Sequence, residues 1–233
     1  KLLLVSFPYL RILYKTMSEI INTFLLSNPF ELVPMERKDF YIEQVAEYKK
    51  NGAPSKAIEV VNILIFNSHG ELIVQKRSYD KTHNPGLLDK SIGGHIQYGD
   101  TPNYTVMIET IQELQTPSIV LNNNEDFDKT FVLLKKYLET IAVIKHFQTT
   151  LYSPIKIVDK EPVQISNKMH LYIGVYDGRI RPVDREAKGV LFYNLDELKK
   201  EMTENPQTFT DDIHLIMREY GAEIQKFVDV IKK

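Results

Sequence analysis

The stretch from Asp89 to Glu113 constrains the fold of this 233-residue chain more than any other segment. Gly93 and Gly94 mark a tight loop, because glycine lets the backbone adopt conformations closed to other residues. Thr101 followed by Pro102 is a typical helix start, since threonine caps the first turn and proline fits its first position. The segment therefore predicts a glycine loop that leads directly into a helix.

The predicted helix carries polar side chains on one side. Glu109, Gln112 and Glu113 stand at i, i+3 and i+4 and so share a face. The opposite face carries Met107, Thr110, Ile111 and Leu114, and we expect it to be buried. Grouped oxygen ligands of this kind suit a hard divalent cation such as Mg²⁺ or Mn²⁺. A cation beside a glycine turn indicates phosphate chemistry.

Composition excludes several classes of protein. The chain has no cysteine, which excludes disulfides, thiolate metal sites and cysteine nucleophiles, and which is typical of a cytoplasmic protein. The net charge is −2, so no basic surplus points to a nucleic acid polymer or an anionic membrane as partner. A small-molecule substrate is the partner that we expect, and the pattern leaves the oligomeric state open.

The remaining elements follow from hydrophobic periodicity. Alternating or β-branched runs predict strands at 57–66, 71–77, 87–92, 169–176, 179–183 and 189–193. Apolar residues at helical spacing predict helices at 37–50, 126–147, 196–202 and from 210 onwards. Strands and helices interleave irregularly, so we expect one mixed α/β fold with a long excursion between 117 and 167.

The N-terminal segment is apolar and needs separate treatment. The run from Leu2 to Leu10 is far shorter than the ~20 residues of a membrane span, and Arg11 and Lys15 interrupt it. Apolar residues continue at helical spacing, which predicts an amphipathic helix over 2–26 that packs on the body of the protein. The predicted division is an N-terminal helical extension over 1–56 and a main domain over 57–233, with a helical insertion around 117–167.

The loop and helix resemble the Nudix box. Gly94 is followed after five residues by Asp100, and after seven more by the run that contains Glu109 and Glu113. The spacing of the box is kept, but four residues depart from it. Asp100 replaces Glu, Ile108 replaces Arg, Gln112 replaces Glu and Gln115 replaces Gly. The resemblance implies a Nudix-like α/β/α sandwich with a mixed sheet, here with extra N-terminal and inserted helices.

Upstream residues resemble the Nudix branch near isopentenyl-diphosphate isomerase. The resemblance is carried by Leu72 to Ser78, Lys81, Pro85-Gly86, Asp89, Ser91, Gly93-Gly94-His95, and later by Tyr193 to Leu198 and Phe209-Thr210. It implies that Arg77 and Lys81 bind a diphosphate and that Gly93 and Gly94 allow its close approach to the backbone. It also implies metal ligands among Glu109, Gln112, Glu113 and Asp100.

Each assignment has a structural alternative. Glu109 and Glu113 are the catalytic residues that the resemblance implies. The alternative is that they only form the solvent-exposed face of a helix, as acidic residues often do. Arg77 and Lys81 also fit surface charges at a strand end, and Asp89 and Ser91 fit bonds to the loop backbone. His95 fits either a metal ligand or a polar loop residue. Glu186 fits either a late carboxylate of the site or an acid in a surface turn.

Two functions are consistent with these residues. The first is a Nudix-type hydrolase that cleaves a diphosphate linkage in a nucleotide or related small metabolite with Mg²⁺ or Mn²⁺ as cofactor. The second is a weak or inactive ligand-binding module on the same scaffold, suggested by the departures at Ile108, Gln112 and Gln115. Isomerase activity is disfavoured, because Gly93 stands where that branch needs a catalytic cysteine.

Overall fold

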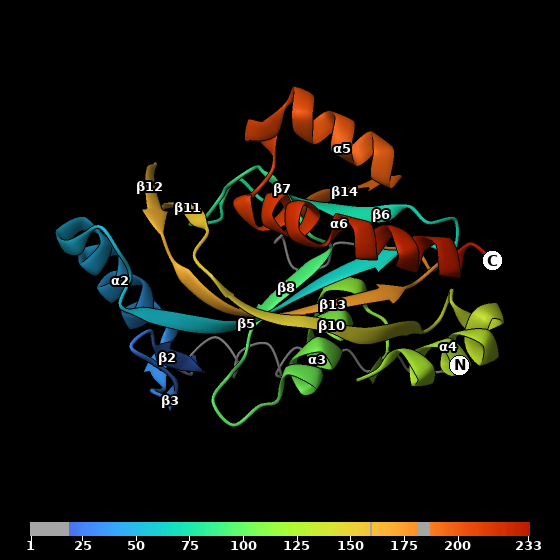
Figure 1. Ribbon diagram of the computed structural model, residues 1–233, viewed down its shortest axis with the longest axis horizontal. Coiled ribbons are helices and arrows are strands. Elements are labelled where there is room, and N and C mark those ends of the chain that lie inside the picture. The colour runs from blue at the N-terminus through green and yellow to red at the C-terminus, as the bar shows by residue number, and fades with distance from the viewer. Residues whose placement is uncertain (1–18, 159, 181–186) are drawn as a thin grey trace, which may run out of the picture.

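The computed structural model describes residues 19–158, 160–180 and 187–233, and its centre is a mixed β-sheet (Figure 1). Along the main path the strands follow the order β14, β6, β5, β13, β10 and β9. They span Ala187–Tyr193, Leu72–Arg77, Lys56–Phe66, Ser166–Val175, Ala142–Tyr152 and Ser118–Leu121, respectively. The β5–β13 and β9–β10 pairs are parallel, and the other neighbours on this path are antiparallel. The predicted mixed α/β sheet is therefore confirmed.

Strand β5 lies at the middle of two hydrophobic cores. Its residues Ile58, Leu64 and Phe66 belong to one core, which α6 (Asp211–Ile231) completes. Its residues Val61 and Ile63 belong to the other core, to which α3 (Pro102–Leu114) contributes. Alternate side chains of a strand point to opposite faces, so helices cover both sides of the sheet (Figure 1). This is the expected α/β/α layering.

Two short strands shape the site. Strand β7 (Leu88–Asp89) pairs with β6, and β8 (Ile92–His95) pairs with β5 in antiparallel register. Sequence patterning predicted a single extended run over 87–92, and the structure divides it between two partners. Strand β8 leads through a loop to α3, and Thr101 caps that helix as predicted by accepting a hydrogen bond from the Tyr104 amide. The glycine loop is thus anchored to the centre of the sheet.

The predicted helix over 2–26 is wrong for its described part. Residues 1–18 lie outside the described residues, and the chain from residue 19 forms strands. These are β1 (Ile20–Ile21), β2 (Thr23–Leu25), β3 (Asn28–Leu32) and β4 (Met35–Glu36). Strand β2 pairs with β5, which gives its backbone groups hydrogen-bond partners and buries Phe24. Pairing with a sheet edge has overridden the helical spacing of the apolar residues.

The other helices are α2 (Arg37–Asn51), α4 (Asn124–Leu134) and α5 (Leu195–Glu204), with single 3-10 turns at Lys135–Tyr137 and Pro206–Thr208. Of these, α2 and α5 match the predictions closely. Helix α2 ends as predicted, with Gly52 in the left-handed conformation (φ 72°). No helix in the described ranges is long and apolar enough to cross a membrane.

The segment 117–167 is not mainly helical, which corrects the prediction of a helix over 126–147. Helix α4 ends at Leu134, and β10 begins at Ala142. Val143 and Ile144 are buried in the sheet, where β-branched side chains pack well. The segment continues as a hairpin of β11 (Ile155–Val158) and β12 (Glu161–Gln164). It supplies two strands of the main sheet path as well as a helix.

The buried face of α3 also differs from the prediction. Val106, Thr110 and Leu114 face the core, whereas Met107 and Ile111 are 42% and 52% exposed. These three residues, at i, i+4 and i+8, pack on the sheet. The prediction placed Met107 and Ile111 on the buried face, whereas the residues one position earlier, at 106 and 110, are the buried ones. Glu113 is itself buried at the edge of this interface. This difference of one position turns the acidic residues towards the cavity described next.

Candidate functional site

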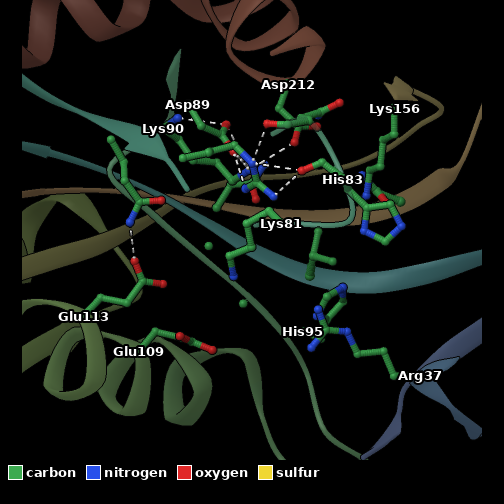
Figure 2. Close-up of a pocket in the computed structure, with 18 of the residues that line it drawn as sticks. Arg37, Lys81, His83, Asp89, Lys90, His95, Glu109, Glu113, Lys156 and Asp212 are labelled. Atoms are coloured by element: carbon green, nitrogen blue, oxygen red, sulfur yellow. Dashed lines mark hydrogen bonds and ion pairs between the residues drawn. The ribbon is translucent and has the colours of Figure 1, made fainter. Parts of the chain in front are cut away.

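A polar cavity of about 260 Å³ opens where the sheet, the glycine loop and α3 meet (Figure 2). Its walls come from β5, β6, β8, α2, α3, β11 and the loop between β6 and β7. Five of its lining residues are basic and five are acidic. These are Arg37, Arg77, Lys81, Lys90 and Lys156, and Glu19, Asp89, Glu109, Glu113 and Asp212. A cavity with both signs of charge suits a ligand that is anionic and carries or meets a cation.

One end of the cavity is formed by α3. Glu109, Gln112 and Glu113 all line it, so the predicted shared face is confirmed as the face towards the cavity. The side-chain amide of Gln75 donates a hydrogen bond of 2.9 Å to Glu113 Oε2. Because Glu113 is buried, this bond fixes the orientation of its carboxylate. A residue of strand β6 here orients a carboxylate of helix α3.

Gly94 allows the glycine loop to lie against Glu109. A Cβ atom on Gly94 would lie 1.9 Å from Glu109 Oε1 and 2.4 Å from Cδ of the same carboxylate. A Cβ on Gly93 would lie 2.6 Å from Lys90 Cε. Both glycines line the cavity as predicted, and they are needed because side chains occupy the space beside them. Any larger residue at position 94 displaces the Glu109 carboxylate.

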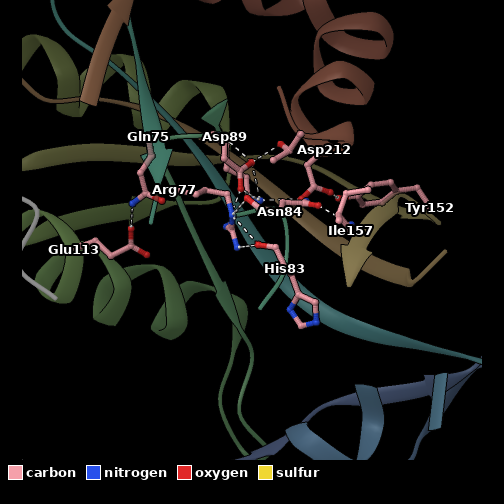
Figure 3. A network of polar contacts seen from close by, with 11 residues as sticks. Gln75, Arg77, His83, Asn84, Asp89, Glu113, Tyr152, Ile157 and Asp212 are labelled. Carbon is pink, nitrogen blue, oxygen red and sulfur yellow. Dashed lines mark hydrogen bonds and ion pairs between the residues drawn. The ribbon is translucent and has the colours of Figure 1, made fainter. Parts of the chain in front are cut away.

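Arg77 lines the cavity but is held by the protein (Figure 3). Its Nε and Nη2 atoms donate to the carbonyl oxygen of His83, at 3.2 and 2.8 Å, and Nε also donates to the carbonyl of Asn84. Its Nη1 atom forms an ion pair of 3.1 Å with Asp89. These bonds fix the loop that follows β6. The geometry thus gives Arg77 a loop-positioning role beside the predicted one in diphosphate binding.

Lys81 is carried by the loop that Arg77 fixes. Its side chain points into the cavity towards α3 (Figure 2). A lysine ammonium at this place supplies a point charge for phosphate oxygens. The structure therefore brings Lys81 together with Glu109 and Glu113, as the sequence predicts.

A buried charge network beneath the cavity was not predicted. Lys90 Nζ contacts Asp212 Oδ2 at 3.0 Å and both carboxylate oxygens of Asp89 at 3.3 Å. Thr210 donates to Asp89, and the Tyr152 hydroxyl donates to Asp212. Asp89 thus bonds mainly to side chains. Ser91 bonds the backbone of strands β5 and β6 and not the loop backbone that was expected.

The network shifts the ionisation of its members. Burial alone raises the pKa of Asp212, but the Lys90 charge and hydrogen bonds outweigh it and hold the pKa at about 2. Burial alone lowers the pKa of Lys90, but Asp212 and Asp89 outweigh it, so the net pKa lies above its ordinary value. Both groups are therefore charged at neutral pH. The ion pair of Lys90 with Asp212 was not predicted, because the two residues are distant in sequence and no local pattern indicates their contact.

His95 is hydrogen-bonded to a side chain of α2, and its role as a metal ligand is not tested. Its Nε2 atom lies 3.0 Å from the Tyr41 hydroxyl, and its ring is buried. Burial, followed by the positive charges of Arg37 and Lys156, keeps its pKa well below the ordinary range. His95 is thus a neutral ring bonded to a tyrosine.

Two candidates remain, Asp100 and Glu186. Asp100 precedes the helix cap, and the residues that line the cavity do not include it. Its backbone amide donates to the Gln97 carbonyl in a tight turn. Glu186 lies outside the described residues. The role of Asp100 as a metal ligand accordingly stays a prediction.

The donor set can be compared with the needs of a divalent cation. Within the described ranges, no three histidine or carboxylate side chains gather into a ready-made metal site. Glu109, Gln112 and Glu113 nevertheless line one wall with oxygen ligands. Mg²⁺ commonly binds through one or two protein carboxylates together with substrate phosphates and water. The residues present fit a cation that is bound jointly by the protein and a phosphate.

Known proteins resemble this chain in sequence and in fold. A protein with 26% identity over 161 residues is an isopentenyl-diphosphate Delta-isomerase of Serratia proteamaculans, and the match covers 69% of this chain and 75% of that protein. An uncharacterized Nudix hydrolase of Listeria innocua is 33% identical over 79 residues, which cover 34% and 47% of the two chains. The crystal structure of DR0079 from Deinococcus radiodurans has the same fold. Its TM-score is 0.55 at 19% identity, with 87% of this chain and 99% of that chain covered.

The family model for the NUDIX domain matches residues 56–213. This range contains the glycine loop, α3 and most of the lining of the cavity, but it leaves out residues 19–51, which supply Glu19, Arg37 and Tyr41. The chain belongs to the NUDIX domain family.

Proposed function

We propose that the protein hydrolyses a diphosphate linkage in a nucleotide or related small metabolite, with Mg²⁺ or Mn²⁺ as cofactor. The observation that carries the proposal is the meeting of Glu109, Glu113 and Lys81 in one cavity. Carboxylates attract the cation, and the ammonium attracts the phosphate that the cation must contact. The family supports hydrolase chemistry in general, and the substrate is inferred from the site.

Glu109 and Glu113 would hold the cation, with the Gln112 amide oxygen as a neutral further ligand. When bound, the cation would neutralise phosphate charge and lower the pKa of a coordinated water. Gln75 keeps the Glu113 carboxylate in one orientation through its hydrogen bond. Gly94 leaves the space that the Glu109 carboxylate occupies. Both features preorganise the acids before a ligand arrives.

The basic residues would place the phosphate. Lys81 supplies a charge in the middle of the cavity (Figure 2). Arg77 holds the loop that carries Lys81, and its guanidinium retains N–H groups beyond those already bonded. The isomerase relative acts on isopentenyl diphosphate, which supports a diphosphate as ligand. Isomerisation is not proposed, because the chain contains no cysteine.

A second candidate is a ligand-binding module without turnover. Gln112 stands in place of a box carboxylate and is exposed, so the cation site has one negative charge fewer than the box provides. Weaker cation binding follows from the lost charge. This candidate predicts thermal stabilisation by diphosphate compounds with no metal-dependent hydrolysis.

Hydrolysis of a panel of nucleoside diphosphate compounds, with Mg²⁺ and with Mn²⁺, tests the first proposal when the phosphate monoesters or the phosphate that form are separated and measured. We expect the Glu113→Gln variant to lose about 100-fold or more in rate, because the cation loses a charged ligand. Glu125→Gln, on the exposed start of α4, is the matched control and should retain the parent rate. Equal rates for Glu113→Gln and the parent would remove Glu113 from the mechanism.

Calorimetric titration with Mn²⁺ separates the two candidates. A hydrolase requires Mn²⁺ binding that Glu113→Gln weakens, together with hydrolysis of the diphosphate compound. Binding of diphosphate compounds with no hydrolysis under any metal condition would favour the ligand-binding module.

A further inference from the structure

The end of the cavity remote from α3 is basic. Arg37 of α2 and Lys156 of β11 lie there, on the side opposite Glu109 and Glu113 (Figure 2). Lys90 and Arg77 also line the cavity, but their charges are engaged by Asp89 and Asp212 and are not part of this end. The cavity is therefore polarised, with helix acids at one end and cations at the other.

Lys156 forms no ion pair with a carboxylate of the described residues, although its charge acts on the buried Asp212 carboxylate. Its ammonium lies 5.7 Å from the centre of the Tyr41 ring, which is a cation–π contact. Arg37 forms an ion pair, at 2.9 Å from Nη1 to Glu19. The charges of Lys156 and Arg37 both act on the His83 and His95 rings, so two cations act together at this end of the cavity.

Two histidines and a tyrosine line the cavity beside these cations. The His83 and Tyr41 rings lie 4.3 Å apart between centres, and the Tyr41 hydroxyl lies 3.0 Å from His95 Nε2. Burial, followed by the charges of Lys156 and Arg37, lowers the pKa of His83 to about 3. Both imidazoles are neutral at pH 7, so each keeps one N–H donor without adding to the repulsion between the cations.

The basic end is held in place by the backbone. The Asn84 amide donates to the Ile157 carbonyl at 3.2 Å, and the Ile157 amide donates to Asn84 Oδ1 at 2.9 Å. These bonds join the loop that carries His83 to the strand that carries Lys156. The donors come from α2, β8, β11 and the loop, so they surround the space from several directions, as a tetrahedral anion requires.

We propose that Arg37, Lys156, His83 and His95 form a subsite for a second phosphate group of the substrate, separate from the diphosphate that meets Glu109 and Glu113. The substrate class is then a diphosphate compound that carries an additional phosphate ester. The diphosphate half of this assignment rests on the proposed hydrolase function, whereas the phosphate subsite itself does not.

Binding of inorganic phosphate in the presence of EDTA tests the subsite without metal or turnover. By calorimetry, we expect Lys156→Gln to raise the Kd of phosphate about tenfold or more, because a charge-assisted contact is lost. Lys50→Gln, on the exposed end of α2, is the matched control and should bind as the parent does.

A second measurement locates the bound anion without a substitution. In nuclear magnetic resonance spectra, the signals of the ring nitrogens of His83 and His95 should shift when phosphate is titrated into the parent protein. Three outcomes would each overturn the subsite. The signals of the two rings could stay unshifted, phosphate could fail to bind without metal, or Lys156→Gln could keep the Kd and the melting temperature of the parent.

The two proposals fail separately. If the nucleotide panel shows no hydrolysis but Lys156→Gln weakens phosphate binding, the hydrolase proposal fails and the subsite stands. If turnover is found, two dinucleotides that differ by one ribose phosphate should differ in KM, and Lys156→Gln should abolish that difference. Turnover with no preference for the additional phosphate would overturn the substrate class.

Discussion

Gln115 occupies the position at which the Nudix box has glycine, and its backbone shows why glycine belongs there. It terminates α3 with φ 54°, in the left-handed region that is strained for residues with a Cβ atom. A Gln115→Gly variant should raise the free energy of unfolding by about 1 kcal/mol, because this strain is removed. Urea denaturation at equilibrium measures the change.

The neighbouring Gln112 provides a control for that substitution. Gln112→Gly places glycine in the right-handed interior of α3, where it should destabilise the protein by about 1 kcal/mol. Opposite signs for two Gln-to-Gly changes three positions apart would link the effect to backbone conformation. A Gln115→Gly variant that is no more stable than the parent would contradict the explanation.

Local spacing was enough to predict the acidic wall of the site. Glu109 and Glu113 are one turn apart, so any helix places them together. The partners of Lys90 lie elsewhere, because Asp212 is 122 positions further along the chain. Lys156 and His83 are likewise joined only by the docking of a hairpin on a loop. Such juxtapositions depend on tertiary structure, and periodicity carries no information about them.

At the scale of elements, the Lys90–Asp212 pair ties the start of α6 to the loop between β7 and β8. The pKa of Asp212 is about 2 in the folded protein and 3.8 as its ordinary value. A carboxyl group with a lowered folded pKa stabilises the protein above the ordinary value, and this stabilisation is lost as the pH falls towards the folded pKa. We expect the loss from this group to be roughly 2 kcal/mol between pH 5 and pH 2.

Urea denaturation of the parent and of Asp212→Asn across that pH range tests the expectation. The parent should lose stability more steeply on acidification than the variant does. Asp229→Asn, on the exposed face of α6, should follow the parent curve. The pKa of Glu59 is also lowered, because hydrogen bonds from His170 and Asn22 outweigh the effect of burial. The contribution of Glu59 is the same in the parent and in both variants. Parallel curves of stability against pH for the parent and Asp212→Asn would therefore contradict the role of Asp212 in acid stability.

Elements were predictable where local signals agreed with tertiary packing. Helix α6 has an apolar stripe that contacts the sheet along its length, and its predicted extent is confirmed. Strand β10 was mistaken for a helix, since Phe127, Phe131 and Leu138 set a helical period that Ile141 happens to continue. The choice between strand and helix at this point is made by pairing with β13 and β9.

At the scale of the molecule, aromatic contacts join the segment 117–167 to the rest of the core. Phe227 of α6 lies 5.4 Å from Phe127 of α4 and 5.9 Å from Phe66 of β5, between ring centres. Phe127 is fully buried. The Phe127→Ala variant should therefore lose about 3–5 kcal/mol of stability through the cavity that it creates.

Unfolding of Phe127→Ala should remain a single transition. Far-ultraviolet circular dichroism and tyrosine fluorescence should give coincident curves if 117–167 and the sheet form one cooperative unit. Val132→Ala, at a position that is 75% exposed on the same helix, should change stability by less than about 0.5 kcal/mol. Two separate transitions would instead support an insertion that folds on its own. The division at residue 56 stays a prediction.

The parallel pairing of β5 with β13 has a consequence for synthesis on the ribosome. Ala57 lies opposite Ser166 and Phe66 opposite Val175, so one long edge of β5 has no neighbour until translation has passed residue 175. An apolar strand with an open edge is prone to pair with other chains. We therefore expect a nascent chain that ends before β13 to be more prone to aggregation than the complete chain.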